Sequence, residues 1–228
     1  MQLDSAHIGV DDLDRAAAHY ALLLGSAPVT TAGGTRRFQL ERGAVELEVG
    51  APGVHAIRFV PAAMSTPTWP VDVDAFNGLD VRIGAMTSPS ITTVSANAVH
   101  AIDHVVINTP DLDRAIALWR DRLGVRLALD REFPSRALRI CFFRSADITL
   151  EFVSSLPPPP DRSGPDRFFG IAYQVADLAG CRDRLLQAGI DVSHVRPGQK
   201  SGTEVATVRS HTSGVPTLLI APVSSRSV

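Results

Sequence analysis

The chain repeats one pattern of residues, and this repeat constrains its fold more than any other feature. Residues 6–25 read AHIGVDDLDRAAAHYALLLG, and residues 103–124 read DHVVINTPDLDRAIALWRDRLG. Asp12 and Asp111 differ by 99 positions, as do Gly25 and Gly124. A weaker third copy begins at Gly170 and ends near residue 189. Repeated units determine an architecture, so we expect the chain to be assembled from copies of one module.

Each copy predicts a strand, a helix and then three further strands. In the second copy Asp111 is a candidate N-cap, apolar residues recur at helical spacing from Ala115 to Leu123, and Gly124 ends the helix. Strand-like segments follow at residues 127–129, 138–143 and 148–153. The third copy predicts a helix over residues 178–188 and strands over 191–195, 204–208 and 217–220. The module is therefore β-α-β-β-β.

The first half of the chain contains one full module and part of another. Residues 3–50 follow the whole pattern, whereas residues 51–97 offer strand signals at 54–60 and 78–83 without a helix pattern between them. We therefore predict an α+β fold of paired modules that form cup-shaped curved sheets, with a shortened second module in the N-terminal half. The expected domains are a degenerate one over residues 1–97 and a complete one over 98–228. The complete domain has modules at 100–155 and 166–223, joined by a proline-rich linker.

Composition excludes several classes of partner. The formal net charge is -2, so no field that would attract nucleic acid is expected. No apolar run approaches the roughly 20 residues that span a bilayer, and the N-terminus has no signal-peptide pattern. Two cysteines cannot form a disulfide framework, so a cytoplasmic location is expected. The shortened module should leave a sheet edge exposed, which predicts a homodimer.

The repeat resembles the vicinal-oxygen-chelate superfamily, which includes glyoxalase I, methylmalonyl-CoA epimerase, bleomycin resistance proteins and extradiol dioxygenases. Three segments carry the resemblance: Asp103-His104-Val-Val-Ile107 with the following Pro110-Asp-Leu-Asp-Arg-Ala115, the helix end Leu123-Gly124, and Thr149-Leu-Glu151-Phe-Val153. It covers residues 100–222 well, residues 3–50 moderately and residues 51–98 poorly. The resemblance implies that two modules close into a cup for a small-molecule ligand. It also implies either one divalent metal ion (Zn, Ni, Mn or Fe) on the first and last strands or, in some branches, none.

Carried over residue by residue, the resemblance assigns His104 and Glu151 as metal ligands and Glu151 as a catalytic base. It assigns His7 and Glu48 to a second, N-terminal site, where His55 lies at the matching position of the shortened module. Gly170 and Leu218 occupy the equivalent positions of the third copy and cannot bind a metal. Copies one and two could instead pair directly and assemble all four ligands, but pairing of adjacent copies is the simpler topology.

Four further residues are candidates for ligand binding. Arg196 and Lys200 lie in a polar, glycine-bearing loop that could hold a carboxylate or phosphate, although a solvated hairpin connection would have the same composition. Arg139 frames a strand, and Tyr173 opens the third copy, where its ring could equally belong to the core.

Three functions follow from the resemblance. The first is a metal-dependent lyase or isomerase acting on a small organic molecule in the C-terminal cup. The second is a metal-free protein that binds or sequesters a small molecule, as bleomycin resistance proteins do, which the loss of ligands at Gly170 and Leu218 favours. The third, an extradiol-type dioxygenase, would need ligands from the module that is depleted here.

Overall fold

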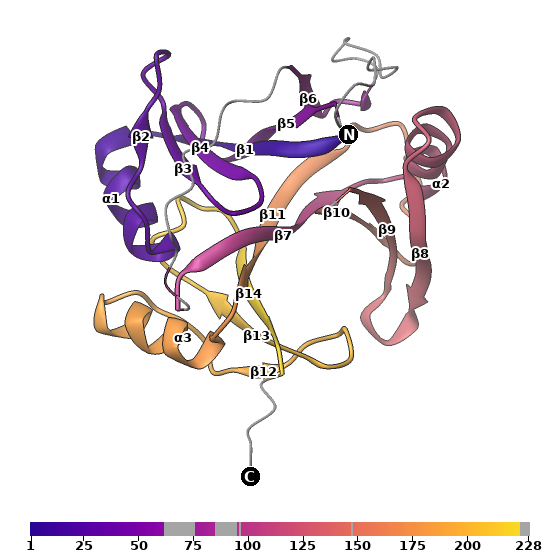
Figure 1. The fold of residues 1–228 in the computed structure, drawn as a ribbon. Helices are drawn as coiled ribbons and strands as arrows, with labels where there is room; N and C mark the ends of the chain where they lie inside the picture. The colour runs from indigo at the N-terminus through magenta and orange to yellow at the C-terminus, as the bar shows by residue number, and fades with distance from the viewer. Residues whose placement is uncertain (62–75, 85–94, 96, 147, 224–228) are drawn as a thin grey trace.

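A computed structural model describes residues 1–61, 76–84, 95, 97–146 and 148–223, and these residues form two curved sheets flanked by helices (Figure 1). Sheet A has the strand order β2-β3-β4-β1-β5-β6. Its strands are β1 (Gln2–Val10), β2 (Val29–Thr30), β3 (Arg36–Gln39), β4 (Ala44–Val49), β5 (Gly53–Val60) and β6 (Asp80–Ile83). The first copy and the shortened module thus share one sheet, and residues 62–75 between β5 and β6 lie outside the described part of the chain.

Sheet B has the strand order β12-β13-β14-β11-β7-β10-β9-β8. Its strands are β7 (Val99–Asn108), β8 (Arg126–Phe133), β9 (Leu138–Ser145), β10 (Ile148–Ser155), β11 (Arg167–Val175), β12 (Arg196–Pro197), β13 (Thr203–Val208) and β14 (Thr217–Pro222). Antiparallel pairing of β7 with β11 joins copies two and three in one continuous sheet. Since the neighbours of β1 are β4 and β5, the alternative in which copies one and two pair directly is wrong.

The helices begin as the repeat predicts. They are α1 (Leu13–Leu24), α2 (Leu112–Ile116) and α3 (Leu178–Gln187), and α2 continues as a π-helical segment over Ala117–Arg122. Asp12, Asp111 and Asp177 each accept a hydrogen bond from a backbone N–H of the first turn, as N-cap residues do. Gly124 follows the helical segment with a φ of 69°, a backbone conformation that favours glycine.

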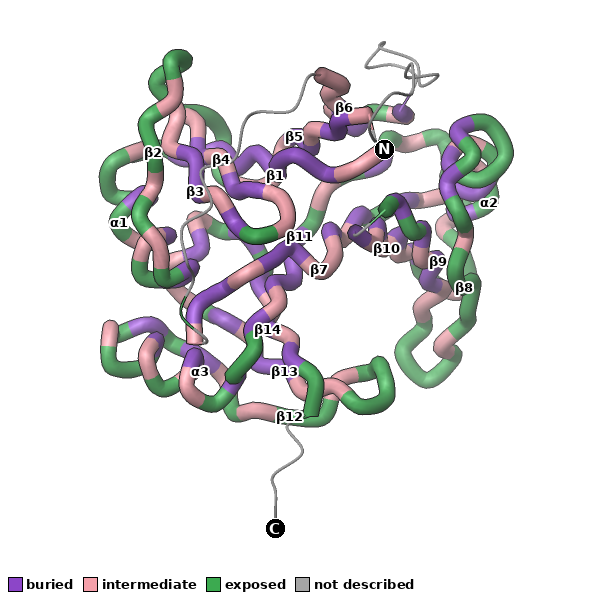
Figure 2. Tube along the Cα trace, in the orientation of Figure 1, coloured by how far each residue is buried: buried purple, intermediate pink, exposed green. Residues whose placement is uncertain are grey.

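The strands of sheet B alternate between two faces. In β10 the side chains of Ile148, Leu150 and Phe152 are buried, whereas Thr149, Glu151 and Val153 are half-buried. Trp119 lies on the Phe152 side, with 5.6 Å between the ring centroids, so the helix of copy two covers that face. We call the opposite face, which carries Thr149, Glu151 and Val153, the cup face. Buried residues concentrate along β7, β11 and β1 in the middle of the molecule (Figure 2).

One predicted strand does not form as expected. Residues 191–195 make a single isolated bridge, Val192 with Val208, and the edge strand of the third copy is β12 at Arg196–Pro197 instead.

Both cysteines are buried free thiols. Within the described residues, no helix combines the length and apolar character that a membrane span requires.

Candidate functional site

Strands β7 and β10 bring His104 and Glu151 together on the cup face. The strands run parallel, and Glu151 pairs with Val106, two residues after His104. Nε2 of His104 lies 3.3 Å from Oε2 of Glu151, and the two side chains are only 14% and 17% exposed. The two residues that the resemblance singles out in copy two are therefore neighbours in a largely buried site.

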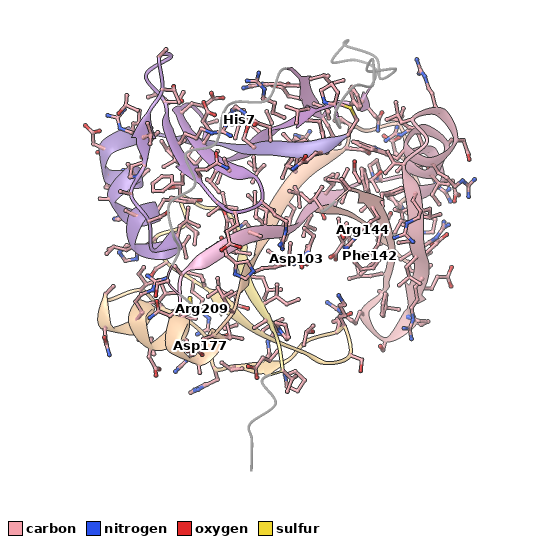
Figure 3. All side chains as sticks on the ribbon, in the orientation of Figure 1. His7, Asp103, Phe142, Arg144, Asp177 and Arg209 are labelled. Carbon is pink, nitrogen blue, oxygen red and sulfur yellow. The ribbon has the colours of Figure 1, made fainter. Side chains whose placement is uncertain are left out.

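A β-bulge adds Asp103 to this pair. Ala172 of β11 pairs with His104 and the next residue, Tyr173, pairs with Ile102, so Asp103 is an extra residue in β7. Such an insertion re-aims the side chains beside it. Oδ2 of Asp103 lies 2.7 Å from Nδ1 of His104, and Figure 3 shows Asp103 on the inner side of the curved sheet. Regular alternation would have placed Asp103 and His104 on opposite faces, which is why sequence reasoning missed Asp103.

Gln174 and Arg42 extend the hydrogen-bonded chain. Gln174 of β11 donates its side-chain amide to Oδ1 of Asp103 and accepts a hydrogen bond from the guanidinium of Arg42 in the β3–β4 turn. Burial alone would raise the pKa of Asp103, but the hydrogen bonds from His104 and Gln174 outweigh it and lower that pKa. Asp103 is therefore an ionised acceptor that can orient the His104 ring, and sheet A supplies one member of the chain.

Burial has the opposite outcome at Glu151. It raises the pKa of this carboxyl group, and the nearby charges of His104 and Arg136 only partly oppose the shift. A carboxylate with a raised pKa is a stronger base than an ordinary glutamate. The arrangement can thus accept a proton at Glu151 and pass it toward Nε2 of His104.

Four cations surround the cup face. Arg144 donates to Oγ1 of Thr149 at 2.9 Å, and Arg196 donates to Oγ1 of Thr207 at 3.3 Å. Lys200 contributes to the lowered pKa of Asp103, and Arg136 acts on Glu151. Within the part of the chain that the structure describes, none of these four cations forms an ion pair with an Asp or Glu side chain. They are therefore available to an anionic ligand.

Arg139 and Tyr173, which the sequence suggested as ligand-binding residues, do not reach the cup face. Arg139 shares a strand face with Cys141 and pairs with Asp113 of α2 at 2.8 Å and with Asp130 at 2.7 Å. Tyr173 is fully buried, and its hydroxyl has no hydrogen-bond partner among the described residues. Strand parity explains both outcomes, because each side chain points to the helix-covered face. Phe142 of β9 pairs with Glu151 across the two strands and lies on the cup face instead (Figure 3).

The third copy adds no metal ligand. Leu218 pairs with Ala172, two residues after Gly170, so Gly170 and Leu218 occupy the places that His104 and Glu151 have in copy two. A Cβ atom on Gly170 would lie 2.5 Å from the carbonyl oxygen of Pro216, so the backbone leaves no room for a side chain there. Across the described residues, no group of three or more His, Cys, Asp and Glu side chains is arranged to hold a metal ion. Catalytic zinc sites use three protein ligands, and the two donors here do not fit a resident metal.

The second predicted pair, His7 and Glu48, lies on sheet A in a different environment. Nδ1 of His7 is 3.7 Å from Oε2 of Glu48, and His55 hydrogen-bonds to the other carboxylate oxygen. Arg82 of β6 contacts the same group, with its Nη1 3.2 Å from Nδ1 of His7. Burial lowers the pKa of His7, and the charge of Arg82 adds to the shift while Glu46 opposes it. Three ligand-type side chains thus meet here, but with a guanidinium among them.

A shallow cavity of about 450 Å³ lies elsewhere, at the carboxyl ends of β7 and β10. Its lining includes Asn108, Thr109, Ser154 and Arg167. It contains none of the residues predicted from the sequence, so we place the candidate site at His104 and Glu151 on chemical grounds.

Known proteins resemble the chain in two ways. A relative, the ethylmalonyl-CoA/methylmalonyl-CoA epimerase of Cereibacter sphaeroides, is 28% identical over 97 residues, which cover 40% of this chain and 72% of the epimerase. A variant of 4-hydroxymandelate synthase from Streptomyces coelicolor superposes with a TM-score of 0.72 at 13% identity, covering 100% of this chain and 94% of the synthase. Methylmalonyl-CoA epimerase from Mycobacterium tuberculosis gives a TM-score of 0.48 at 21% identity, covering 59% and 95% of the two chains.

The structural likeness to the synthase shows that the whole chain shares its fold, and the sequence comparison identifies the family of the C-terminal half. Residues 103–207 match the family model described as the Glyoxalase/Bleomycin resistance protein/Dioxygenase superfamily. This range contains His104, Glu151 and both modules of sheet B. The C-terminal half of the chain is therefore a member of the glyoxalase/bleomycin resistance protein/dioxygenase superfamily.

Proposed function

We propose that the cup face of sheet B binds a small organic anion and that Glu151 abstracts a proton from it in an isomerase-type reaction. One observation carries the proposal: a buried carboxylate with a raised pKa lies 3.3 Å from a histidine, on a face with four cations that lack carboxylate partners among the described residues. A general base works best when its pKa lies near the working pH, and unpaired cations favour an anionic ligand.

Each residue has its own role in the proposed reaction. The carboxylate of Glu151 takes a proton from a carbon next to a carbonyl group, and the electron pair moves to the carbonyl oxygen to form an enolate. His104 can receive the proton from Glu151 at Nε2, because Asp103 accepts from Nδ1 and Nε2 faces the carboxylate of Glu151. Return of a proton to either side of the carbon restores the carbonyl and yields substrate or its isomer. Arg136, near Glu151, can balance the charge of the enolate.

The epimerase relative supports this reaction class, since epimerisation next to a carbonyl proceeds by loss and return of one proton. Its name also supplies the first substrates to test, the CoA thioesters of methylmalonate and ethylmalonate. A CoA thioester is strongly anionic, which agrees with the cations around the cup face. Metal-assisted versions of this chemistry are common in the superfamily, but two donors do not complete a metal site, so no step of the proposal uses one.

A binding protein without catalysis is the second candidate. Gly170 and Leu218 favour it, because copy three contributes no ionisable side chain at the two positions that face copy two. The two candidates differ in one measurable respect: only the isomerase exchanges a substrate hydrogen with solvent.

Hydrogen exchange in D2O provides the test. Purified protein is incubated with methylmalonyl-CoA or ethylmalonyl-CoA, and NMR follows loss of the proton on the carbon next to the thioester. Wild-type protein should exchange that proton faster than buffer does, and Glu151→Gln should lose the acceleration while still binding the thioester. Glu132→Gln, which neutralises an exposed carboxylate of β8, is the matched control and should behave as wild type.

The outcome separates the candidates. Thermal stabilisation of wild type and Glu151→Gln by a ligand that neither protein exchanges would support the binding protein and refute the isomerase. Hydrogen exchange that continues at the wild-type rate in Glu151→Gln would show that Glu151 is not the base.

We also propose a homodimer, since β6 and β8 are the edge strands of their sheets within the described part of the chain. Size-exclusion chromatography with light scattering measures the mass directly, and a monomer at micromolar concentration would refute this part of the proposal.

A further inference from the structure

His7, Glu48 and His55 are side chains of the kind that bind transition metals, and they meet on sheet A. Imidazole and carboxylate together suit Zn²⁺ and related ions. We propose that the guanidinium of Arg82 occupies the place of a metal ion in this cluster, so that the wild-type protein excludes metal there and loss of Arg82 opens a metal site. The proposal concerns sheet A alone and is independent of the function proposed for sheet B.

Arg82 donates hydrogen bonds to the same lone pairs that a metal would need. Its Nη1 donates to Nδ1 of His7 at 3.2 Å, and its Nη2 donates to Oε1 of Glu48 at 3.5 Å. A ring nitrogen that accepts a hydrogen bond presents its lone pair, which is also the electron pair that binds a metal. Nε2 of His7, 3.1 Å from Oγ of Ser5, then carries the ring proton. His7 is thus in the tautomer that a metal at Nδ1 would require, with an N–H group of Arg82 in the metal's position.

The guanidinium is also fixed in position. Asp80, two residues earlier on β6, accepts from Nε of Arg82 at 3.0 Å and from Nη2 at 2.9 Å.

The rings of His7 and His55 have centroids 6.3 Å apart. Two imidazoles on one tetrahedral zinc, with Zn–N bonds of about 2 Å, would have centroids about 5 Å apart. The cluster is therefore wider than a zinc site, as expected if a planar guanidinium keeps the rings apart.

Charge gives a second reason why Arg82 excludes a metal. A divalent ion beside a guanidinium would experience strong repulsion in this half-buried environment. Removing the guanidinium leaves two imidazoles, the carboxylate of Glu48 and the nearby carboxylate of Asp80. Arg82→Ala should therefore yield a three-donor site with room for water, and Arg82→Glu should add a fourth donor in place of the cation.

Zinc binding to the full chain tests the proposal without any substrate. Wild type, Arg82→Ala, Arg82→Glu and Arg82→Lys are dialysed against Zn²⁺, and bound metal is measured by elemental analysis and by isothermal titration calorimetry. Arg82→Ala and Arg82→Glu should each bind about one equivalent more than wild type, because a three-donor site suffices for zinc. Arg82→Lys keeps a positive charge and should bind no additional metal. Arg15→Glu, with the same change of net charge on an exposed side chain of α1, should match wild type.

A second substitution assigns the added metal to this cluster. His7→Ala combined with Arg82→Glu should return the zinc content to the wild-type value. Two results would overturn the proposal: folded Arg82→Ala and Arg82→Glu proteins that bind no more zinc than wild type, or one equivalent in wild type that His7→Ala removes. Circular dichroism verifies folding, and Arg82→Ala provides the test if the charge reversal in Arg82→Glu prevents folding.

Discussion

Arg184 should connect the two halves of the protein, and its removal should destabilise the whole chain. This arginine of α3 donates from Nη2 to the carbonyl oxygen of Leu23 at 3.1 Å and from Nε to that of Asn97 at 3.2 Å, and it also contacts the carbonyl of Leu22. Leu22 and Leu23 lie in the last turn of α1, where carbonyl groups lack partners within the helix. A cation at that end also interacts favourably with the helix dipole.

The size of the effect follows from these contacts. Hydrogen bonds that involve a charged group contribute roughly 1.5–3 kcal/mol each when buried. Arg184 is half-buried and water can replace part of its contacts, so we expect Arg184→Ala to lower the free energy of unfolding by about 3 kcal/mol in total. For a chain of this length that loss corresponds to a fall of about 6–12 °C in the melting temperature. Arg184→Lys keeps the charge but not the planar guanidinium, so its free energy of unfolding should lie between those of wild type and Arg184→Ala.

Thermal and urea unfolding, followed by circular dichroism, measure both quantities. Arg209→Ala is the control, because Arg209 and its partner Asp191 are both 58% exposed and a surface ion pair of that kind contributes about 0–1 kcal/mol. If Arg184→Ala destabilises the protein no more than Arg209→Ala does, the contacts of Arg184 with α1 do not stabilise the fold and the reasoning fails.

Three further predictions concern single residues. Burial raises the folded-state pKa of Glu151 above its unfolded value, so the contribution of this group to stability is present below about pH 4 and lost as the pH rises through the folded pKa. Glu151→Gln should therefore raise the melting temperature at pH 7 but not near pH 4, and a pH-independent difference would contradict this. Asp111→Ala should cost about 1 kcal/mol in urea unfolding, since the N-cap of α2 is lost; an unchanged midpoint would contradict it. Gly170→Ala should cost about 1–3 kcal/mol through its clash with Pro216, whereas Gly50→Ala, whose Cβ would make only a 3.9 Å contact with Gly9, should cost far less.

Local signals in the sequence predicted the modules well. The three N-cap aspartates act within one helical turn, so neighbouring residues alone determine their role. Pairing of copies two and three followed from adjacency along the chain, which the sheet order confirms. The pairing of His104 with Glu151 followed from the resemblance, which gave the two strand positions.

Features that depend on strand register were not predictable. Arg139 and Tyr173 have suitable side chains for a ligand, but which face they occupy depends on the parity of their strands. Gln174 and Arg42 approach Asp103 from a neighbouring strand and from the other sheet, so no spacing in the sequence connects them. The segment 191–195 has strand-like residues, yet β12 forms after it, at Arg196.

One-residue insertions have a large effect on both candidate sites. In β5 the pairing moves from Ala56–His7 to Val54–Ile8, so His55 is an extra residue, as Asp103 is in β7. A regular strand places only one of two consecutive residues on a given face, and an insertion lifts that restriction. In sheet B the extra residue supplies the acceptor that orients His104.

In sheet A the extra residue supplies a second imidazole to Glu48. The same device therefore has two outcomes, and the surroundings of the two carboxylates differ. In sheet B the last strand of the partner module carries Leu218, and burial leaves Glu151 with a raised pKa. In sheet A the last strand of the partner module carries Arg82, and the pKa of Glu48 is lowered because His55 first, and then His7 and Arg82, outweigh the effect of burial. A carboxylate held ionised by a cation is a weak base, so proton abstraction is expected on sheet B and not on sheet A.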